Sequence, residues 1–263
     1  MKTLKILSFN LKTDTIFTKE ANKLHKRIKY IKEMLNILDY DILGVQELPL
    51  NKYNDLSSYL NKYHAFGLAR NDKSLNDELS AIFLLKDRFK IIKEDTFWLS
   101  NTPNNKGSKY KLSIFPRICT LALALDTHTN KYILFANTHL DHLLSSTRKN
   151  QIKQLINIIN EYKDNYNPLI FITGDFNTNI NSSAIKYLIN SNLNIKSVYN
   201  KETFNTIHFF KGIINNNLEP IDHIFVDNRV NIIDYNIINK DIDGIYPSDH
   251  YPVIATINIG DNI

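Results

Sequence analysis

The segment Leu169-Ile170-Phe171-Ile172-Thr173-Gly174-Asp175-Phe176-Asn177 combines a short apolar run with two polar residues at its end. The run has the length and composition of a buried β-strand. Residues two apart on an extended chain project to the same side, so Asp175 and Asn177 point together. Such a pair can orient a water molecule as a base and donate to a phosphoryl oxygen. An Asx turn at the end of a strand is an equal alternative for this motif taken alone.

Other strand-length runs carry polar residues at their ends in the same way. They are rich in Ile, Val, Phe and Tyr and cover residues 4–9, 41–46, 79–85, 90–98, 118–125, 132–138, 221–226, 231–238 and 252–257. Asn10, Glu47 and His139 close three of these runs, as Asp175 closes the run described above. Because open α/β sheets bind ligands at the carboxyl ends of their strands, these four ends are candidates for one shared crevice.

A second group of polar residues stands where strands begin: Glu78, Arg117, Asp222, Asp249 and His250. If these residues share the crevice, their strands run away from it, and the sheets are mixed. The early and late portions of the chain each carry strands of both senses, which predicts two mixed sheets packed together with helices outside. Helical spacing of apolar residues occurs twice, at Leu24, Ile28, Ile31, Leu35 and Leu38 and at Ile152, Leu155, Ile156 and Ile159.

Length and composition indicate a globular protein with a substantial core. The chain has 263 residues, of which 43% are hydrophobic and 22% charged, and no repeat or long linker interrupts it, so we expect a single domain over residues 1–263. The net charge of +5 suits an anionic ligand, but the Lys and Arg residues are scattered, and a generic solvated surface explains them equally well.

The cellular setting follows from three sequence features. The single cysteine, Cys119, excludes an internal disulfide and favours a reducing compartment. The N-terminal segment lacks the apolar region and cleavage site of a signal peptide, and no stretch approaches transmembrane length. We therefore expect a cytoplasmic protein without a membrane partner.

Carboxylates and histidines at the strand ends suggest acid–base and metal chemistry. Glu47 is a plausible ligand for a hard cation such as Mg²⁺, although an exposed strand-end glutamate would look the same. A catalytic histidine needs a partner that fixes its tautomer, and Asp222 is a candidate for His250. Glu78 is a candidate partner for His139. For Asp222 and Glu78 the alternative is ordinary charge at a strand edge or in a loop.

Two other catalytic classes are disfavoured. Ser248, Asp249 and His250 are adjacent, and consecutive side chains point to opposite sides of an extended segment, so they cannot form a serine hydrolase triad. The sequence also lacks a Gly-x-Ser-x-Gly elbow and any Cys/His cluster with zinc spacing.

Taken together, the motifs resemble the endonuclease/exonuclease/phosphatase superfamily. The matching pieces stand in family order across residues 4–257: Leu7-Ser8-Phe9-Asn10, Gly44-Val45-Gln46-Glu47, Asn137-Thr138-His139-Leu140-Asp141, Gly174-Asp175-Phe176-Asn177, Ile221-Asp222-His223-Ile224 and Ser248-Asp249-His250. The resemblance implies a four-layer α/β sandwich, in which two packed mixed β-sheets are flanked by helices, and we expect it to be monomeric. It also implies Mg²⁺ or Mn²⁺ as the cofactor.

The resemblance assigns roles by position. Glu47 matches the principal magnesium ligand, with Asn10 and Asp249 in support. Asp175 matches the residue that orients or deprotonates the attacking water, and Asn177 matches a donor to the transition state.

The remaining roles belong to the histidines. His250 matches the phosphate-contacting histidine and is held by Asp222. His139 matches the second histidine of the nuclease branch, with Glu78 as its orienting carboxylate. The abasic-site enzymes carry tyrosine at the position of His139, which disfavours that activity.

A further segment resembles a bacterial group near the deadenylase and nocturnin branch, namely Phe97-Trp98-Leu99-Ser100-Asn101-Thr102-Pro103 followed by Pro116-Arg117. Arg117 stands at a strand start, where it can contact a substrate phosphate or form a surface salt bridge. We expect hydrolysis of phosphodiester bonds in nucleic acid or nucleotides, with 3′-end exonuclease action among the candidates. The alternatives are a phosphatase of a small phosphorylated metabolite or lipid, and a non-catalytic binding module.

Overall fold

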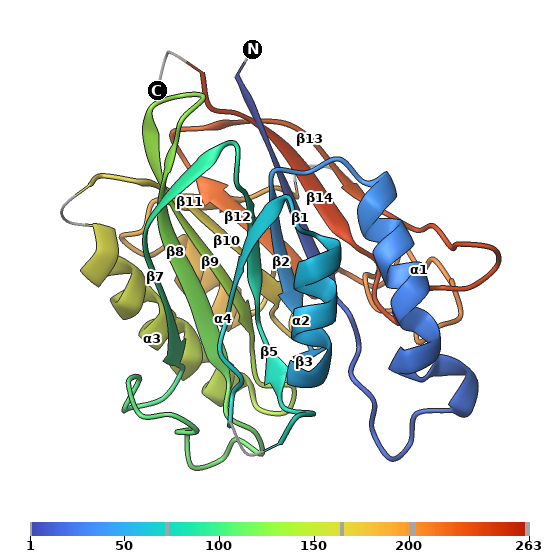
Figure 1. The fold of residues 1–263 in the computed structure, drawn as a ribbon. Coiled ribbons are helices and arrows are strands. Elements are labelled where there is room, and N and C mark those ends of the chain that lie inside the picture. Colours follow the sequence, from blue (N-terminus) through green and yellow to red (C-terminus); the bar gives the residue numbers. More distant parts are fainter. Residues whose placement is uncertain (1, 72–73, 164–165, 200–202, 261–263) are drawn as a thin grey trace.

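Two six-stranded β-sheets form the centre of the computed structural model, which describes residues 2–71, 74–163, 166–199 and 203–260 (Figure 1). The first sheet has the order β13 (Asn231–Ile237), β14 (Val253–Asn258), β1 (Thr3–Asn10), β2 (Ile42–Gln46), β6 (Ile82–Leu85) and β4 (Tyr63–Phe66). The second has the order β11 (Ile195–Ser197), β12 (Asp222–Asp227), β10 (Leu169–Asp175), β9 (Lys131–His139), β8 (Ile118–Asp126) and β7 (Phe89–Trp98). A small third sheet pairs β3 (Leu48–Pro49) with β5 (Glu78–Leu79).

Helices cover the outer face of each large sheet. The helices α1 (Leu24–Ile37) and α2 (Leu50–Tyr59) pack on the first sheet, and α3 (Ser145–Lys163) and α4 (Ser183–Ile189) pack on the second (Figure 1). A 3₁₀ turn at Glu20–Asn22 precedes α1. In the described residues, none of these helices combines the length and the apolar character that crossing a bilayer requires.

Three apolar cores hold the four layers together. The inner faces of the two sheets meet in one core, which includes Ile6, Phe135, Phe171 and Val253. The other two cores lie between each sheet and its helices. The predicted four-layer α/β sandwich is therefore confirmed.

The sheets are mixed, as the polar strand ends predicted. β1 runs parallel to β2, and β9 runs parallel to β10, whereas the other pairings in the large sheets are antiparallel. Both predicted helices and all predicted strand regions are present, although the run 79–85 divides into β5 and β6. The short elements α2, α4, β4 and β11 were not predicted, because each has too few residues to show a clear period.

Strand alternation explains why polar residues gather where the sheets meet. Leu4 and Ile6 of β1 face the inner core, so Asn10, which has the same parity, also lies on the inner side of its sheet. The same count places His139 in line with Ile133 and Phe135 of β9, and Asp175 in line with Phe171 of β10. On the inner face of each of these strands, core residues are thus followed by polar residues at one end.

The two sheets approach each other closely next to this end. A Cβ atom at Gly44 of β2 would lie 2.6 Å from Asn137 Oδ1 and would also clash with Thr173, both in the opposite sheet. Asn137 accepts hydrogen bonds from Gln46 Nε2 (2.7 Å) and Thr173 Oγ1 (3.0 Å). This buried polar network ties the sheets together directly behind the polar strand ends.

Candidate active site

The predicted residues from both sheets converge at one edge of the sandwich. Asp175 at the end of β10 lies in register with His139 on β9 and with Asp222 on β12. Asn10 joins the two sheets, because its Nδ2 donates to Asp175 Oδ2 (3.0 Å) and to Glu47 Oε1 (3.1 Å). Its own Oδ1 accepts from the backbone N–H of Lys12 (2.9 Å), which fixes the orientation of the amide. Asn10 therefore positions the two carboxylates.

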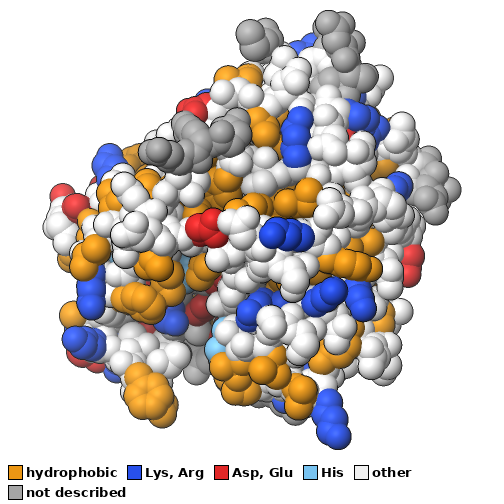
Figure 2. Space-filling model, turned by 180° about the vertical axis from the view of Figure 1, so that it is seen from behind, with side chains coloured by type: hydrophobic (Ala, Val, Ile, Leu, Met, Phe, Trp, Pro, Cys, Tyr) orange, Lys and Arg blue, Asp and Glu red, His pale blue; other side chains and the backbone are white. Residues whose placement is uncertain are grey.

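These side chains surround a cleft of about 540 Å³. Most of the predicted residues line it, namely Glu47, Glu78, Arg117, His139, Asp175, Asn177, Asp249 and His250. Asn10 and Asp222 are not part of the lining; they are buried behind Glu47, Asp175 and His250. Figure 2 shows a hollow flanked by hydrophobic side chains, with acidic and histidine side chains visible in it.

Asp222 and His250 form a buried pair. His250 Nδ1 donates to Asp222 Oδ2 at 2.8 Å, and both residues are at most 5% exposed. His250 Nε2 lies 3.9 Å from Asp175 Oδ2 and 4.0 Å from Asp249 Oδ1, on the cleft side. Burial alone would lower the pKa of His250, but the charge and hydrogen bond of Asp222, with the charges of Asp175 and Asp249, raise it to about 10. The predicted partner of His250 is thus confirmed.

Asp175 has the electrostatics of a base that can hold a proton. Its burial and the neighbouring charge of Asp222 raise the pKa of Asp175 to about 7. Its Oδ1 accepts from the backbone N–H of Asn177 (2.8 Å), so the Asx turn is formed. Asn177 nevertheless lines the cleft with Asp175, and its Nδ2 donates to Leu140 O (3.0 Å). The Asx turn is thus present, and both side chains of the motif also line the cleft.

Two of the site residues have left-handed backbone conformations. Glu47 has a φ of 55° and Asn177 a φ of 50°, values that are uncommon for residues other than glycine. Glu47 is the single residue between β2 and β3, where the chain turns out of the first sheet. Such conformations persist only where surrounding contacts impose them, and they cluster at functional sites. Here the hydrogen bonds from Asn10 Nδ2 and from Thr13 N (2.9 Å) hold the Glu47 carboxylate.

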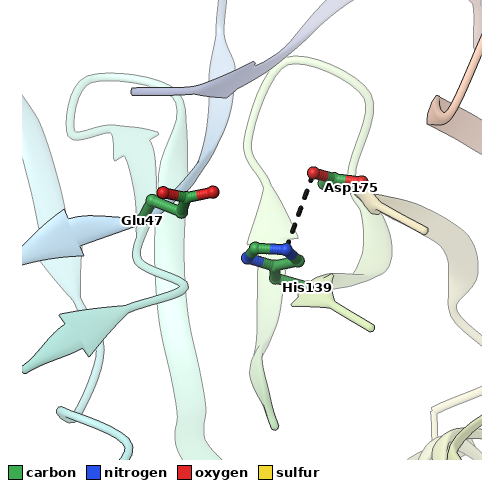
Figure 3. Close-up of side chains that lie close together, drawn as sticks. All are labelled: Glu47, His139 and Asp175. Carbon is green, nitrogen blue, oxygen red and sulfur yellow. Dashed lines mark ion pairs between the residues drawn. The ribbon is translucent and has the colours of Figure 1, made fainter. Parts of the chain in front are cut away.

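One group of side chains suits a divalent cation. Ligand atoms of Glu47, His139 and Asp175 all lie within 4.8 Å of one another, and the three side chains point toward a common space (Figure 3). Asp249 Oδ1 is buried without a hydrogen-bond partner in the described structure, and burial raises the pKa of Asp249. Mg²⁺ prefers one or two carboxylates, and Mn²⁺ accepts a similar set with a histidine. The donor set therefore fits such an ion.

Asp175, Asp222 and His250 form a second group of the same kind. The hydrogen bond between Asp222 and His250 already engages two of its members, so we interpret it as an acid–base unit.

Lys12 occupies the space between the carboxylates in this structure. Its Nζ lies 3.9 Å from both Glu47 Oε2 and Asp249 Oδ2. Although burial would raise the pKa of Glu47, the charge of Lys12 and the hydrogen bond from Asn10 hold that pKa below its ordinary value. The sequence analysis did not predict Lys12 as a site residue. Its position two residues after Asn10 could have indicated that it lies near the site.

The predicted pairing of Glu78 with His139 is not what the structure contains. Both oxygens of Glu78 accept from Arg70, from Nη1 at 2.7 Å and from Nη2 at 2.9 Å. The carboxylate that approaches His139 is Asp175, whose Oδ2 lies 3.6 Å from Nε2. Arg70 lies in the connection between β4 and β5, and its backbone N–H donates to Glu78 O. Arg70 is therefore close enough to bind the Glu78 carboxylate in place of His139.

Arg117 lies inside the cleft and is only 5% exposed, so the surface salt bridge is not formed. Its Nη2 lies 3.2 Å from His142 Nδ1, and Arg70, Phe115 and His142 line the cleft beside it.

Three exposed phenylalanines, Phe17, Phe115 and Phe209, stand in the cleft lining on separate loops. No spacing in the sequence pointed to these loop residues.

Comparisons with known proteins agree with this geometry. A family model described as the endonuclease/exonuclease/phosphatase family matches residues 7–250. A protein of that family from Bacteroides thetaiotaomicron is 26% identical, with a TM-score of 0.89 over 100% of this chain and 98% of that one. A mannosyl-6-phosphatase from Bacteroides thetaiotaomicron is 27% identical, with a TM-score of 0.87 over 97% of this chain and 100% of that one.

A more distant similarity concerns the fold alone. The human nocturnin catalytic domain is 17% identical, with a TM-score of 0.78 over 97% of this chain and 93% of that one. A comparison with curated proteins found no significant match.

The fold is that of the α/β sandwich class, and a family model of phosphoric-ester hydrolases matches the chain. Because the family model matches most of its length, the chain belongs to the endonuclease/exonuclease/phosphatase family.

Proposed function

We propose that the protein hydrolyses phosphate esters with the help of Mg²⁺ or Mn²⁺. The observation that carries the proposal is the junction at Asp175. Its Oδ2 accepts from Asn10, which also holds Glu47, and the same oxygen lies 3.9 Å from Nε2 of His250, the partner of Asp222. A metal-binding half and an acid–base half therefore meet at one buried carboxylate.

Glu47 would hold the metal ion with support from Asp249, and Asn10 would orient the Glu47 carboxylate. Asp175 and His139, the other two members of the group that suits a cation, act on the water and the phosphate instead. When bound, a divalent cation neutralises charge on the phosphate and draws electron density from phosphorus. Lys12 Nζ lies 3.9 Å from the carboxylates of both Glu47 and Asp249, so its ammonium would compete with a bound cation for them.

The protein's own groups carry out the proton transfer. Asp175 accepts a proton from a water molecule, whose oxygen attacks phosphorus opposite the leaving group. The new P–O bond forms as the ester P–O bond breaks, and the electron pair leaves with the ester oxygen. The His250 imidazolium, kept charged by Asp222, and the Asn177 amide stabilise the negative charge on the phosphoryl oxygens. His139 acts as a neutral donor, because burial and the charge of Arg117 lower its pKa well below the ordinary value.

Two substrate classes have specific support. Phosphodiesters of nucleic acid or nucleotides are favoured by Phe17, Phe115 and Phe209 at the cleft, since aromatic side chains stack on bases. A phosphorylated metabolite is favoured by the similarity to the Bacteroides thetaiotaomicron mannosyl-6-phosphatase.

The experiment is a hydrolysis assay on matched chromogenic phosphodiesters and phosphomonoesters, with Mg²⁺, with Mn²⁺ and with excess chelator. We expect metal-dependent turnover that Asp175→Asn reduces by about 100-fold or more. Glu161→Gln, on the exposed face of α3, is the control for loss of a carboxylate and should retain full activity. Wild-type activity in Asp175→Asn would contradict the proposed role.

A further inference from the structure

Arg117 is a buried cation that forms no ion pair with any residue that the structure describes. It precedes β8, lines the cleft and is 5% exposed. Within the described residues, no carboxylate lies within ion-pair distance of its guanidinium, its Nε has no hydrogen-bond partner, and Nη2 meets only the ring nitrogen of His142. Burying an unpaired charge is costly, so such a group is retained where a ligand supplies the missing charge.

The neighbouring guanidinium of Arg70 already has a carboxylate partner. Nη1 and Nη2 of Arg70 donate to Glu78, and the guanidinium carbon of Arg70 lies 4.6 Å from the centre of the Phe115 ring. The backbone oxygen of Arg70 also accepts from Trp98 Nε1 (2.6 Å), which fixes this wall of the cleft. Burial and the charge of Arg70 lower the pKa of Arg117 and the charge of Glu78 raises it, so the two charges of this pair oppose each other at Arg117.

The position of Arg117 relates it to the reacting phosphate. Arg117 and His139 line the same part of the cleft, and burial together with the charge of Arg117 lowers the pKa of His139. His139 Nε2 is 3.6 Å from Asp175 Oδ2, the oxygen that also accepts from Asn10. A phosphate attacked by a water molecule on Asp175 thus lies in the same cleft as the metal-binding carboxylates and Arg117.

We propose that Arg117 binds the third non-bridging oxygen of a phosphomonoester dianion, which makes terminal phosphate esters the preferred substrate class. This inference rests on the proposed function of the same site. A phosphomonoester has three non-bridging oxygens and two negative charges, whereas a phosphodiester has two such oxygens and one charge. In a diester the third position holds an ester oxygen, which is a poor acceptor and carries a chain toward Phe115 and His142. A guanidinium binds phosphate oxygens through directed, charge-assisted hydrogen bonds.

The test compares two substrates with one leaving group, p-nitrophenyl phosphate and methyl p-nitrophenyl phosphate, at saturating Mg²⁺ or Mn²⁺. We expect the wild-type protein to have the higher kcat/KM for the monoester. Arg117→Met should lower kcat/KM for the monoester by about 100-fold, the typical loss of one transition-state donor, and lower it for the diester by no more than about fivefold. Arg117→Lys, which keeps the charge but not the paired donors, should recover part of the monoester activity.

Arg148→Met is the matched control. Arg148 lies on α3, donates to Asp141 O (2.9 Å) and is outside the cleft lining, so its loss should leave both substrates unaffected. Inhibition by inorganic phosphate supplies a readout independent of turnover, and Arg117→Met should weaken it by at least about tenfold. Melting temperatures show whether each variant is folded.

The outcomes separate this inference from the proposed function. Equal losses of the two activities in Arg117→Met, or a wild-type preference for the diester, would overturn the role of Arg117 while metal-dependent hydrolysis stands. If Arg117→Met does not fold, two measurements still test the role of Arg117. They are the wild-type preference between the two esters and the monoester activity of Arg117→Lys. Absence of metal-dependent hydrolysis of either ester in the wild-type protein would overturn the proposed function itself.

Discussion

Removing the charge of Asp222 tests whether the Asp222–His250 pair is a catalytic unit. In the structure this carboxylate, with Asp175 and Asp249, overcomes the effect of burial and raises the pKa of His250 to about 10. Asp222→Asn can still hold the ring through a hydrogen bond but supplies no charge. If the pKa of His250 returns to an ordinary value of about 6.5, only about 3% of the ring stays protonated at pH 8, and kcat should fall by about 30-fold.

Asp222→Ala should be worse than Asp222→Asn, because the ring also loses its orientation, and we expect a loss of about 100-fold or more. The double variant Asp222→Ala/His250→Ala should be scarcely worse than His250→Ala alone, since the pair acts as a unit. Steady-state kinetics on one phosphate ester at saturating metal measure all four variants. Asp227→Asn, at the other end of β12, controls for loss of a buried carboxylate far from the cleft. Multiplicative losses in the double variant would refute the pairing.

Three further predictions concern stability and metal binding. The folded pKa of His250 is raised, so its contribution to the stability of the metal-free protein is complete below about pH 6.5 and is lost as pH rises toward 10. Urea unfolding should show a loss of the order of 5 kcal/mol over this range, and the loss should be largely absent in Asp222→Asn. Lys12→Met should bind Mn²⁺ at least about tenfold more tightly by calorimetry, because the ion no longer displaces an ammonium from the two carboxylates. Gly44→Ala should destabilise the fold by about 1–3 kcal/mol in urea unfolding, because its Cβ would meet Asn137 of the opposite sheet.

Each of these predictions has a contrary result. An identical pH dependence of unfolding in the wild-type protein and in Asp222→Asn would show that Asp222 does not set the pKa of His250. Unchanged or weaker Mn²⁺ binding by Lys12→Met would mean that Lys12 does not compete for the metal site. A neutral effect of Gly44→Ala would show that the sheets have room to separate there.

The site residues on strands could be predicted because side chains alternate regularly between the two faces of a strand. The alternation that buries Phe171 also fixes the side of the sheet on which Asp175 lies. The polar residues stand at the ends of some strands and at the beginnings of others. They can lie at one edge only if the sheets contain strands of both directions, so mixed sheets could be predicted as well. These two facts account for the correct placement of His139, Asp222 and His250 around Asp175.

Loop-borne residues could not be predicted, because the path of a loop depends on contacts that local sequence does not encode. Arg70 reaches Glu78 from a connection of no recognisable pattern, which is why the expected Glu78–His139 pairing failed. Lys12 takes its place between two carboxylates only after the chain turns beyond β1. The Gln46–Asn137 hydrogen bond likewise depends on the separation of the two sheets.

Metal binding and hydrolysis measured together on Glu47→Gln test the central claim most directly. Glu47 lies within 4.8 Å of His139 and Asp175 ligand atoms, so replacing one of its oxygens by an amide nitrogen removes the candidate ligand with little change in shape. The wild-type protein should bind Mn²⁺ in a calorimetric titration and hydrolyse a phosphate ester only with metal present. Glu47→Gln should lose both properties while keeping its metal-free melting temperature. Full hydrolysis in excess chelator, or undiminished metal binding and turnover in Glu47→Gln, would contradict a metal-dependent phosphoesterase at this site.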